Sequence, residues 1–77
     1  MTTQRFTLKG EFIELNVLLK LLALAPSGGA AKSLIACGEV RVDGTAETRI
    51  RRKLRAGNVV RVGGTEILIA AAEGGLS

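Results

Sequence analysis

The sequence contains no histidine, tryptophan or tyrosine, and its only cysteine is Cys37. Without histidine, neither a Ser/His/Asp nor a Cys/His catalytic set can be assembled, and no phosphate-binding loop motif is present. One cysteine cannot form a disulfide within the chain or an ordinary zinc cluster, so a reducing, cytoplasmic setting fits best. We expect Cys37 to be a small core residue rather than a nucleophile. The sequence therefore predicts a protein that is not an enzyme and uses no cofactor or metal.

Aromatic residues are also scarce, because Phe6 and Phe12 are the only two. Both lie in the apolar N-terminal pattern. RNA modules that read sequence usually stack unpaired bases on exposed aromatic rings. The sequence therefore predicts that no such stacking platform exists.

No apolar run is long enough to span a membrane. Residues 17–26, VLLKLLALAP, resemble the apolar part of a secretory signal, but Lys20 interrupts the run and Glu11 and Glu14 precede it. A secretory signal has a basic, acid-free start and an unbroken apolar core. We therefore interpret the stretch as a buried helix.

Positive charge is what the chain has in excess. Its net charge is +4, and five of the eight residues in TRIRRKLR (48–55) are Arg or Lys, with no acid among them. This balance favours an anionic partner, which could be nucleic acid, an acidic protein or anionic lipid. The alternative is a solvated basic loop without function, although such loops usually have neutralising acids nearby.

The first half of the chain predicts a strand and two helices within a single domain, 1–77. RFTLK (5–9) alternates like a strand. Helical spacing then begins at Leu15 and should end near Leu24, before Pro26, with Lys20 pointing away from the apolar face. That face is formed by Leu15, Leu18, Leu19 and Leu22 and widened by Val17, Leu21 and Leu24.

A second helix is predicted over 28–37, with Ser27 as its N-cap and Gly38 as its C-terminal cap. Its inner face would carry Ala31, Leu34 and Ile35. Glycines at 28 and 29 have two interpretations. They could permit close helix packing or a flexible turn, or they could expose backbone N–H groups to an anion, assisted by Lys32.

The second half predicts strands. EVRVD (39–43) is followed by an Asp43-Gly44 turn, and NVVRV (58–62) and TEILIA (65–70) form a hairpin around Gly63-Gly64. Between them, the basic stretch should be a loop or irregular strand that is anchored by Ile50 and Leu54 and holds its cations in solvent. The acids Glu39, Asp43 and Glu47 fit ordinary turn and strand-face positions.

In this order of elements, SGGAAKSLIACGEVRVDGTAETRIRRKLRAGNVVRV (27–62) resembles a small RNA-binding domain. That domain was first seen in the fourth protein of the small ribosomal subunit, and the stand-alone bacterial versions of the YbcJ and YaaA type are more similar still. The likeness covers about residues 12–69. Its matching positions are Leu19, Lys20, Gly28, Gly29, Ala31, Lys32, Gly38, Val40, Val42, Asp43, Gly44, Glu47, Thr48, Arg49, Arg52, Lys53, Leu54 and Gly57.

Two departures from the family pattern affect the basic stretch. Family members commonly read Arg-Arg-Gly-Arg-Lys-Leu where this chain has RIRRKL (49–54), so two positions differ, Ile50 and Arg51, and one cation in effect stands at 51 instead of 50. The frequent Gly-Asp is Gly57-Asn58 here, which removes an acid and should make the local field more positive.

The resemblance implies an α/β (α+β) fold, with two packed helices against a small, mostly antiparallel sheet that carries the αL RNA-binding motif. It also implies that the chain binds structured RNA, ribosomal or transfer RNA, as a monomer, with no membrane or small-molecule partner. The expected mode is shape and phosphate contact. The expected contacts are the side chains of Lys20, Lys32, Arg49, Arg51, Arg52, Lys53 and Arg55 and the backbone of Gly28 and Gly29.

Two other functions compete with this interpretation. One is a protein-interaction adaptor that docks an acidic protein surface, which exposure of Leu68 and Ile69 would favour. The other is duplex DNA binding, which is disfavoured because nothing resembles a recognition helix for the major groove.

Overall fold

The structure is a computed structural model that describes residues 2–72. Within that range, the predicted order of strand, two helices and further strands is observed, with an additional two-residue strand, Ile13–Glu14, before the first helix. The elements are β1 (Thr2–Thr7), β2 (Ile13–Glu14), α1 (Leu15–Leu21), α2 (Gly28–Ala36), β3 (Val40–Val42), β4 (Thr45–Ala46), β5 (Lys53–Leu54), β6 (Val59–Val62) and β7 (Thr65–Ala70).

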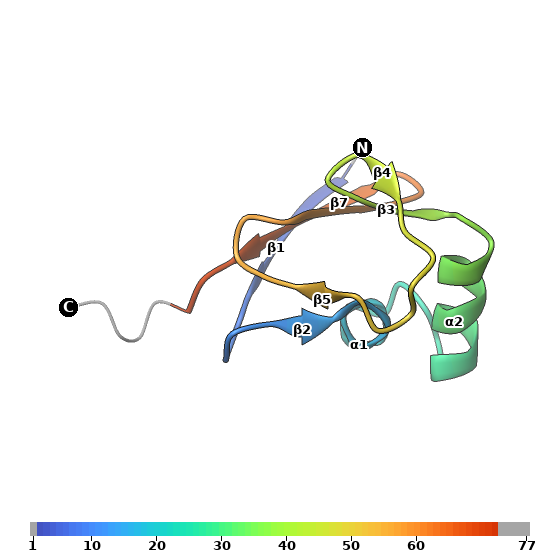
Figure 1. Cartoon of the computed structure of the whole chain (residues 1–77), viewed down its shortest axis with the longest axis horizontal. Coiled ribbons are helices and arrows are strands. Elements are labelled where there is room, and N and C mark those ends of the chain that lie inside the picture. Colours follow the sequence, from blue (N-terminus) through green and yellow to red (C-terminus); the bar gives the residue numbers. More distant parts are fainter. Residues whose placement is uncertain (1, 73–77) are drawn as a thin grey trace.

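The strands form a five-stranded sheet in the order β1-β7-β6-β3-β4 and a separate ribbon of β2 and β5. All pairs are antiparallel except β1 with β7, so the predicted mostly antiparallel sheet is confirmed. The N-terminal strand spans 2–7 rather than the predicted 5–9, because Thr2 to Thr7 pair residue by residue with Thr65 to Ala70. Figure 1 shows the ribbon β2–β5 beneath the sheet and α2 at one end.

The core lies where the helices meet the inner face of the sheet. Buried leucines of α1 and Ile35 of α2 pack with alternate residues of β3, β6 and β7. Leu54, the predicted anchor in β5, is fully buried, and the second anchor, Ile50, is partly buried against the same cluster. Buried hydrophobic residues are Leu8, Leu15, Leu18, Leu19, Ala25, Ala31, Ile35, Val40, Val42, Leu54, Val60, Ile67 and Ile69.

Helix α1 ends at Leu21, earlier than the predicted end near Leu24. Ala23 adopts the left-handed conformation, with φ of 59°, and the Leu24 N–H donates to the Leu19 carbonyl at 2.9 Å. The left-handed residue ends the helix before the chain reaches Pro26, although alanine is unfavourable in the left-handed conformation. Val17 and Leu21 are exposed, so the apolar face of α1 is narrower than predicted.

Helix α2 has the predicted caps. The Ala30 N–H donates to Ser27 Oγ at 3.1 Å, and Gly38 has φ of 83° where the helix ends. Cys37 is exposed, so its predicted place in the core is wrong. It follows the last helical turn, outside the i, i+4 row of Ala31 and Ile35 that faces the core.

The predicted turn at Asp43-Gly44 joins β3 to β4, and both residues have positive φ, 53° and 86°. Two positive φ values are characteristic of the type I′ hairpin turn. Within residues 2–72, no helix is both long and apolar enough to cross a bilayer.

Candidate nucleic-acid interface

The basic segment, residues 49–55, is docked on α1 by its own backbone. The N–H groups of Leu15 and Asn16 donate to the carbonyls of Arg52 and Ile50, at 2.9 and 3.1 Å. These N–H groups belong to the first two residues of α1 and have no partner inside the helix. The segment then enters β5, where Leu54 pairs with Ile13. Its cations are therefore carried on an anchored strip of chain rather than on a free loop (Figure 1).

The carboxylate of Glu47 binds the basic segment from its buried side. Glu47 is only 7% exposed. Its Oε2 accepts from the backbone N–H and from Nε of Arg49, each at 3.0 Å, and its Oε1 accepts from Arg52 at 2.6 Å. The prediction that Glu47 is an ordinary strand-face acid is wrong, because one buried carboxylate ties two arginines of the segment to the end of β4.

The charge of Glu47 follows from these contacts. The side-chain hydrogen bond from Arg49 is the largest cause that lowers the pKa of Glu47, from 4.5 to about 2, while burial opposes the shift. The same contact raises the pKa of Arg49. Charge-assisted hydrogen bonds of this kind favour the ionised form. Glu47 therefore stays ionised at neutral pH and offsets one positive charge of the segment.

The arginines that Glu47 binds are not equally accessible. The Arg49 side chain is 72% exposed, whereas that of Arg52 is 28% exposed. The prediction that all cations of the segment lie in solvent is therefore wrong for Arg52. This residue holds the segment in place, and replacing it would disturb the fold along with any binding.

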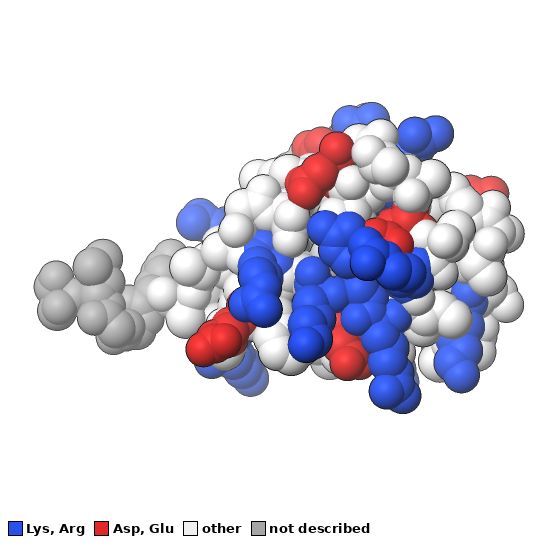
Figure 2. All heavy atoms as spheres, viewed as in Figure 1, with Lys and Arg blue, Asp and Glu red and all other residues white. Residues whose placement is uncertain are grey.

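The other cations of the segment are accessible. Arg51, Lys53 and Arg55 are exposed, and none forms an ion pair within residues 2–72. Figure 2 shows basic side chains gathered over the middle of one face, with one further basic group at the side where α2 lies. An open hollow on this surface is lined by Arg49, Arg51, Arg52 and Lys53.

The remaining predicted contacts lie on the helices. Lys20 in α1 and Lys32 in α2 are exposed. A Cβ atom at Gly28 would meet nothing within 4 Å, and one at Gly29 only Ser27 Oγ at 3.9 Å. Close helix packing therefore does not explain this glycine pair. Ser27 caps Ala30, which leaves the N–H groups of Gly28 and Gly29 outside the capping bond.

The far end of the basic segment is fixed by a side-chain network. The Arg55 N–H donates to Asn58 Oδ1 at 2.7 Å, and Asn58 Nδ2 donates to Asp43 Oδ2 at 2.7 Å. The Val59 N–H donates to the other carboxylate oxygen of Asp43 at 2.9 Å. An aspartate at position 58 could not make the donation to Asp43, so the Asn at 58 has a structural role besides removing an acid.

We expect Asn58→Asp to lower the free energy of unfolding by about 1 kcal/mol, because it replaces a charge-assisted hydrogen bond by two facing carboxylates. Adding Asp43→Asn restores a donor and an acceptor and should recover most of the loss. Urea denaturation of the wild type, both single variants and the double variant measures this coupling. An additive double variant would contradict it.

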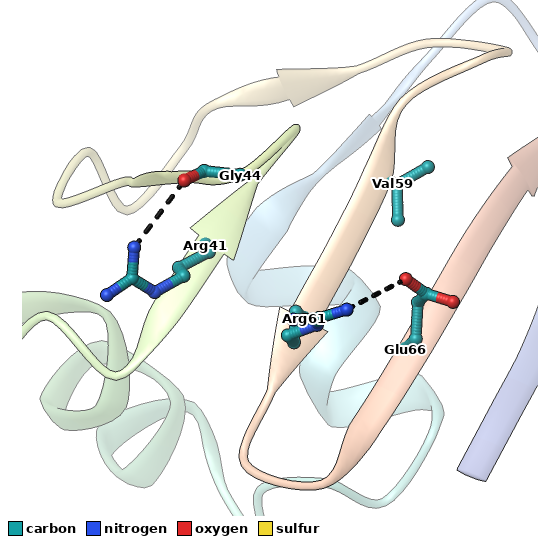
Figure 3. A pocket seen from close by; sticks show the side chains of 5 residues that line it. All are labelled: Arg41, Gly44, Val59, Arg61 and Glu66. Atoms are coloured by element: carbon teal, nitrogen blue, oxygen red, sulfur yellow. Dashed lines mark hydrogen bonds and ion pairs between the residues drawn. The ribbon is translucent and has the colours of Figure 1, made fainter. Parts of the chain in front are cut away.

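A second hollow lies on the outer face of the sheet and is shown in Figure 3. Arg41 of β3 and Arg61 of β6 are cross-strand neighbours there. Arg61 pairs with Glu66 of β7 at 3.3 Å, and Arg41 donates to the Gly44 carbonyl at 3.4 Å (Figure 3). Because Glu66 offsets one of the two arginines, this hollow is less positive than that of the basic segment. No cluster suited to a metal ion occurs among residues 2–72.

The exposure of Phe12 differs from what the sequence predicts. Phe12 is 40% exposed, with Lys53 Nζ 4.9 Å and the Arg55 guanidinium carbon 5.6 Å from the centre of its ring. The prediction of no stacking platform depended on both phenylalanines belonging to the apolar N-terminal pattern, and the exposure of Phe12 contradicts that premise. No local pattern indicates this exposure, because it depends on the pairing of β2 with β5, some forty residues apart in the chain.

Comparison with known proteins extends over most of the chain. A family model described as the S4 domain matches residues 6–70. The YbcJ proteins of Escherichia coli (strain K12) and Shigella flexneri are each 44% identical over 63 residues, which is 82% of this chain and 90% of theirs. The solution structure of E. coli YbcJ aligns with a TM-score of 0.67 over 87% of this chain and 86% of that one. That structure was described as revealing an αL motif involved in RNA binding.

Proposed function

Because the chain belongs to the S4 domain family, we propose that it is a non-enzymatic module that binds structured RNA through the basic segment and the start of α2. One observation carries the proposal most directly. The accessible cations of the segment stand on a backbone that is fixed at three places, by α1, by Glu47 and by Asn58. The αL motif described for YbcJ as involved in RNA binding supports the same function.

The chemistry of the surface suits phosphate and ribose groups. Arg49, Arg51, Lys53 and Arg55 would contact phosphates, and Arg52 would mainly hold the segment against Glu47. Cations on a fixed backbone suit the phosphate spacing of a folded RNA, since little backbone order has to be gained on binding. Ribosomal or transfer RNA, bound by a monomer in the cytoplasm, fits this arrangement.

Contacts from the helices would select a folded partner. Lys20 and Lys32 lie on different elements from the basic segment, so only an RNA with phosphates in several directions can reach all of them. The N–H groups of Gly28 and Gly29, which lie outside the Ser27 capping bond, would add a phosphate contact at the positive end of α2. Unfolding the RNA should therefore weaken binding.

The protein-adaptor alternative has less support in the structure. Of the two strand residues that would favour it, Ile69 is buried and only Leu68 is exposed, at 40%. Duplex DNA remains disfavoured, because α2 spans only Gly28–Ala36 and its first four residues are glycine and alanine, which offer base edges no hydrogen-bonding side chain.

The test compares three probes at 50 and 200 mM salt: a ribosomal RNA hairpin with a junction, duplex DNA of equal length, and an acidic protein. We expect the folded RNA to bind most tightly, with an affinity that falls steeply as salt increases. The same RNA, with its sequence changed so that it stays single-stranded, is the matched control for shape. Tighter binding of the acidic protein than of the RNA would refute the proposal in favour of the adaptor function.

A further inference from the structure

We propose that Phe12, with Lys53 and Arg55 beside it, forms a site for one unpaired nucleobase at the edge of the basic segment. This inference rests on the RNA binding proposed above and adds a base contact to a surface otherwise suited to phosphates. Phe12 is 40% exposed. Lys53 Nζ lies 4.9 Å and the Arg55 guanidinium carbon 5.6 Å from the centre of its ring.

Phe12 does not pack against the hydrophobic core. Phe6 and Ile13 are partly buried and pack against the core cluster, whereas Phe12 is not part of that set. A large apolar ring left in water is unfavourable by roughly 25 cal/mol for each Å² that could be buried. Phe12 thus presents apolar area that a ligand can cover.

The two cations can act on a ligand at this ring. Both side chains are exposed, and neither forms an ion pair within residues 2–72. Contacts between a cation and an exposed aromatic ring contribute only about 0.5–1 kcal/mol. A base that stacks on Phe12 can therefore displace them from the ring, and they are then placed to pair with the phosphates on either side of that base.

The surroundings of the ring indicate which ligand fits. Phe12 lines a mainly apolar hollow together with Ile13, Leu21 and Leu22, and Thr7 and Lys9 also line it. A flat, weakly polar ring fits such a surface without leaving buried groups unpaired, and a stacked base meets this condition. A base already paired in a helix has both faces covered by its neighbours, so the site requires a bulged or loop base. Purines should bind better than pyrimidines because they stack over a larger area.

The test uses two RNA hairpins that differ only in a single bulged adenine. In both, a short non-nucleotide linker replaces the terminal loop, so that the bulged adenine is the one unpaired base. Phe12→Leu keeps an apolar side chain and removes the ring, and we expect it to weaken binding of the bulged hairpin by about 5- to 150-fold, the range of one lost base stack. Binding of the fully paired hairpin should not change. Phe12→Trp should retain or improve binding of the bulged hairpin. Leu68→Ala, at an equally exposed apolar position in β7, is the matched control and should change neither affinity.

Stacking itself is measured by placing 2-aminopurine in the bulge. Its fluorescence should fall when the wild type or Phe12→Trp binds and should fall much less with Phe12→Leu. If Phe12→Leu lost affinity equally for both hairpins, or lost affinity for neither, the base site would be overturned. RNA binding by the basic segment would remain in place. Failure of the wild type to bind either hairpin would instead refute the proposed function, and the base site with it.

Discussion

Replacing Arg51, Lys53 and Arg55 together with glutamine is expected to lower RNA affinity by about 100- to 500-fold at 0.1 M salt. Each lost phosphate contact reduces the slope of log affinity against log salt by about 0.7–0.9, which corresponds to about a five- to eightfold loss at 0.1 M relative to 1 M. Folding should be nearly unaffected, because these three side chains are exposed and form no ion pair within the described residues. The contacts of Lys53 and Arg55 with the exposed Phe12 ring are weak. Arg49 and Arg52 are left in place because Glu47 binds them.

A second triple variant, Arg5→Gln, Arg41→Gln and Arg61→Gln, provides the matched control. It changes the net charge by the same three units but removes exposed cations outside the basic segment. Affinity and salt slope are measured by titration of both variants at several salt concentrations. Equal losses in the two variants would show that net charge alone drives binding and would contradict the assignment of the basic segment as the interface.

Glu47→Gln is expected to lower the free energy of unfolding by about 1–3 kcal/mol, because it removes the charged partner of several hydrogen bonds in a largely buried place. The change leaves Arg52, at 28% exposure, without its carboxylate. Glu66→Gln is the matched control. It breaks the more exposed pair with Arg61 and should cost no more than about 1 kcal/mol. Urea denaturation at pH 7 compares the two.

The destabilisation caused by Glu47→Gln should depend on pH. The pKa of Glu47 is about 2 in the folded protein against 4.5 for the ordinary group, so folding favours its ionised form. The stabilisation by Glu47 is therefore fully present above about pH 5 and is lost as the pH falls from 4.5 towards 2. The difference in unfolding free energy between wild type and Glu47→Gln should shrink over that range. A difference that stays constant down to pH 2 would contradict the role of the Glu47 charge.

Local sequence determined much of the fold. The leucine spacing from Leu15 indicates α1, Ser27 and Gly38 cap α2 as predicted, and Asp43-Gly44 makes the predicted turn. These features depend on residues within a few positions of one another, where side-chain periodicity and backbone conformational preference act directly. The location of the basic segment and its two anchors, Ile50 and Leu54, was predictable for the same reason.

The roles of individual side chains at the candidate interface were decided by tertiary structure. Glu47 is buried beneath Arg52, and Phe12 is exposed beside Lys53, because β2 pairs with β5 and the segment docks on the start of α1. The parallel pairing of β1 with β7 likewise joins the two ends of the described chain. A sequence pattern reports which residues share a face of one element. Burial, ion pairing and exposure depend on which other element covers that face, and contacts between distant segments determine this only when the chain has folded.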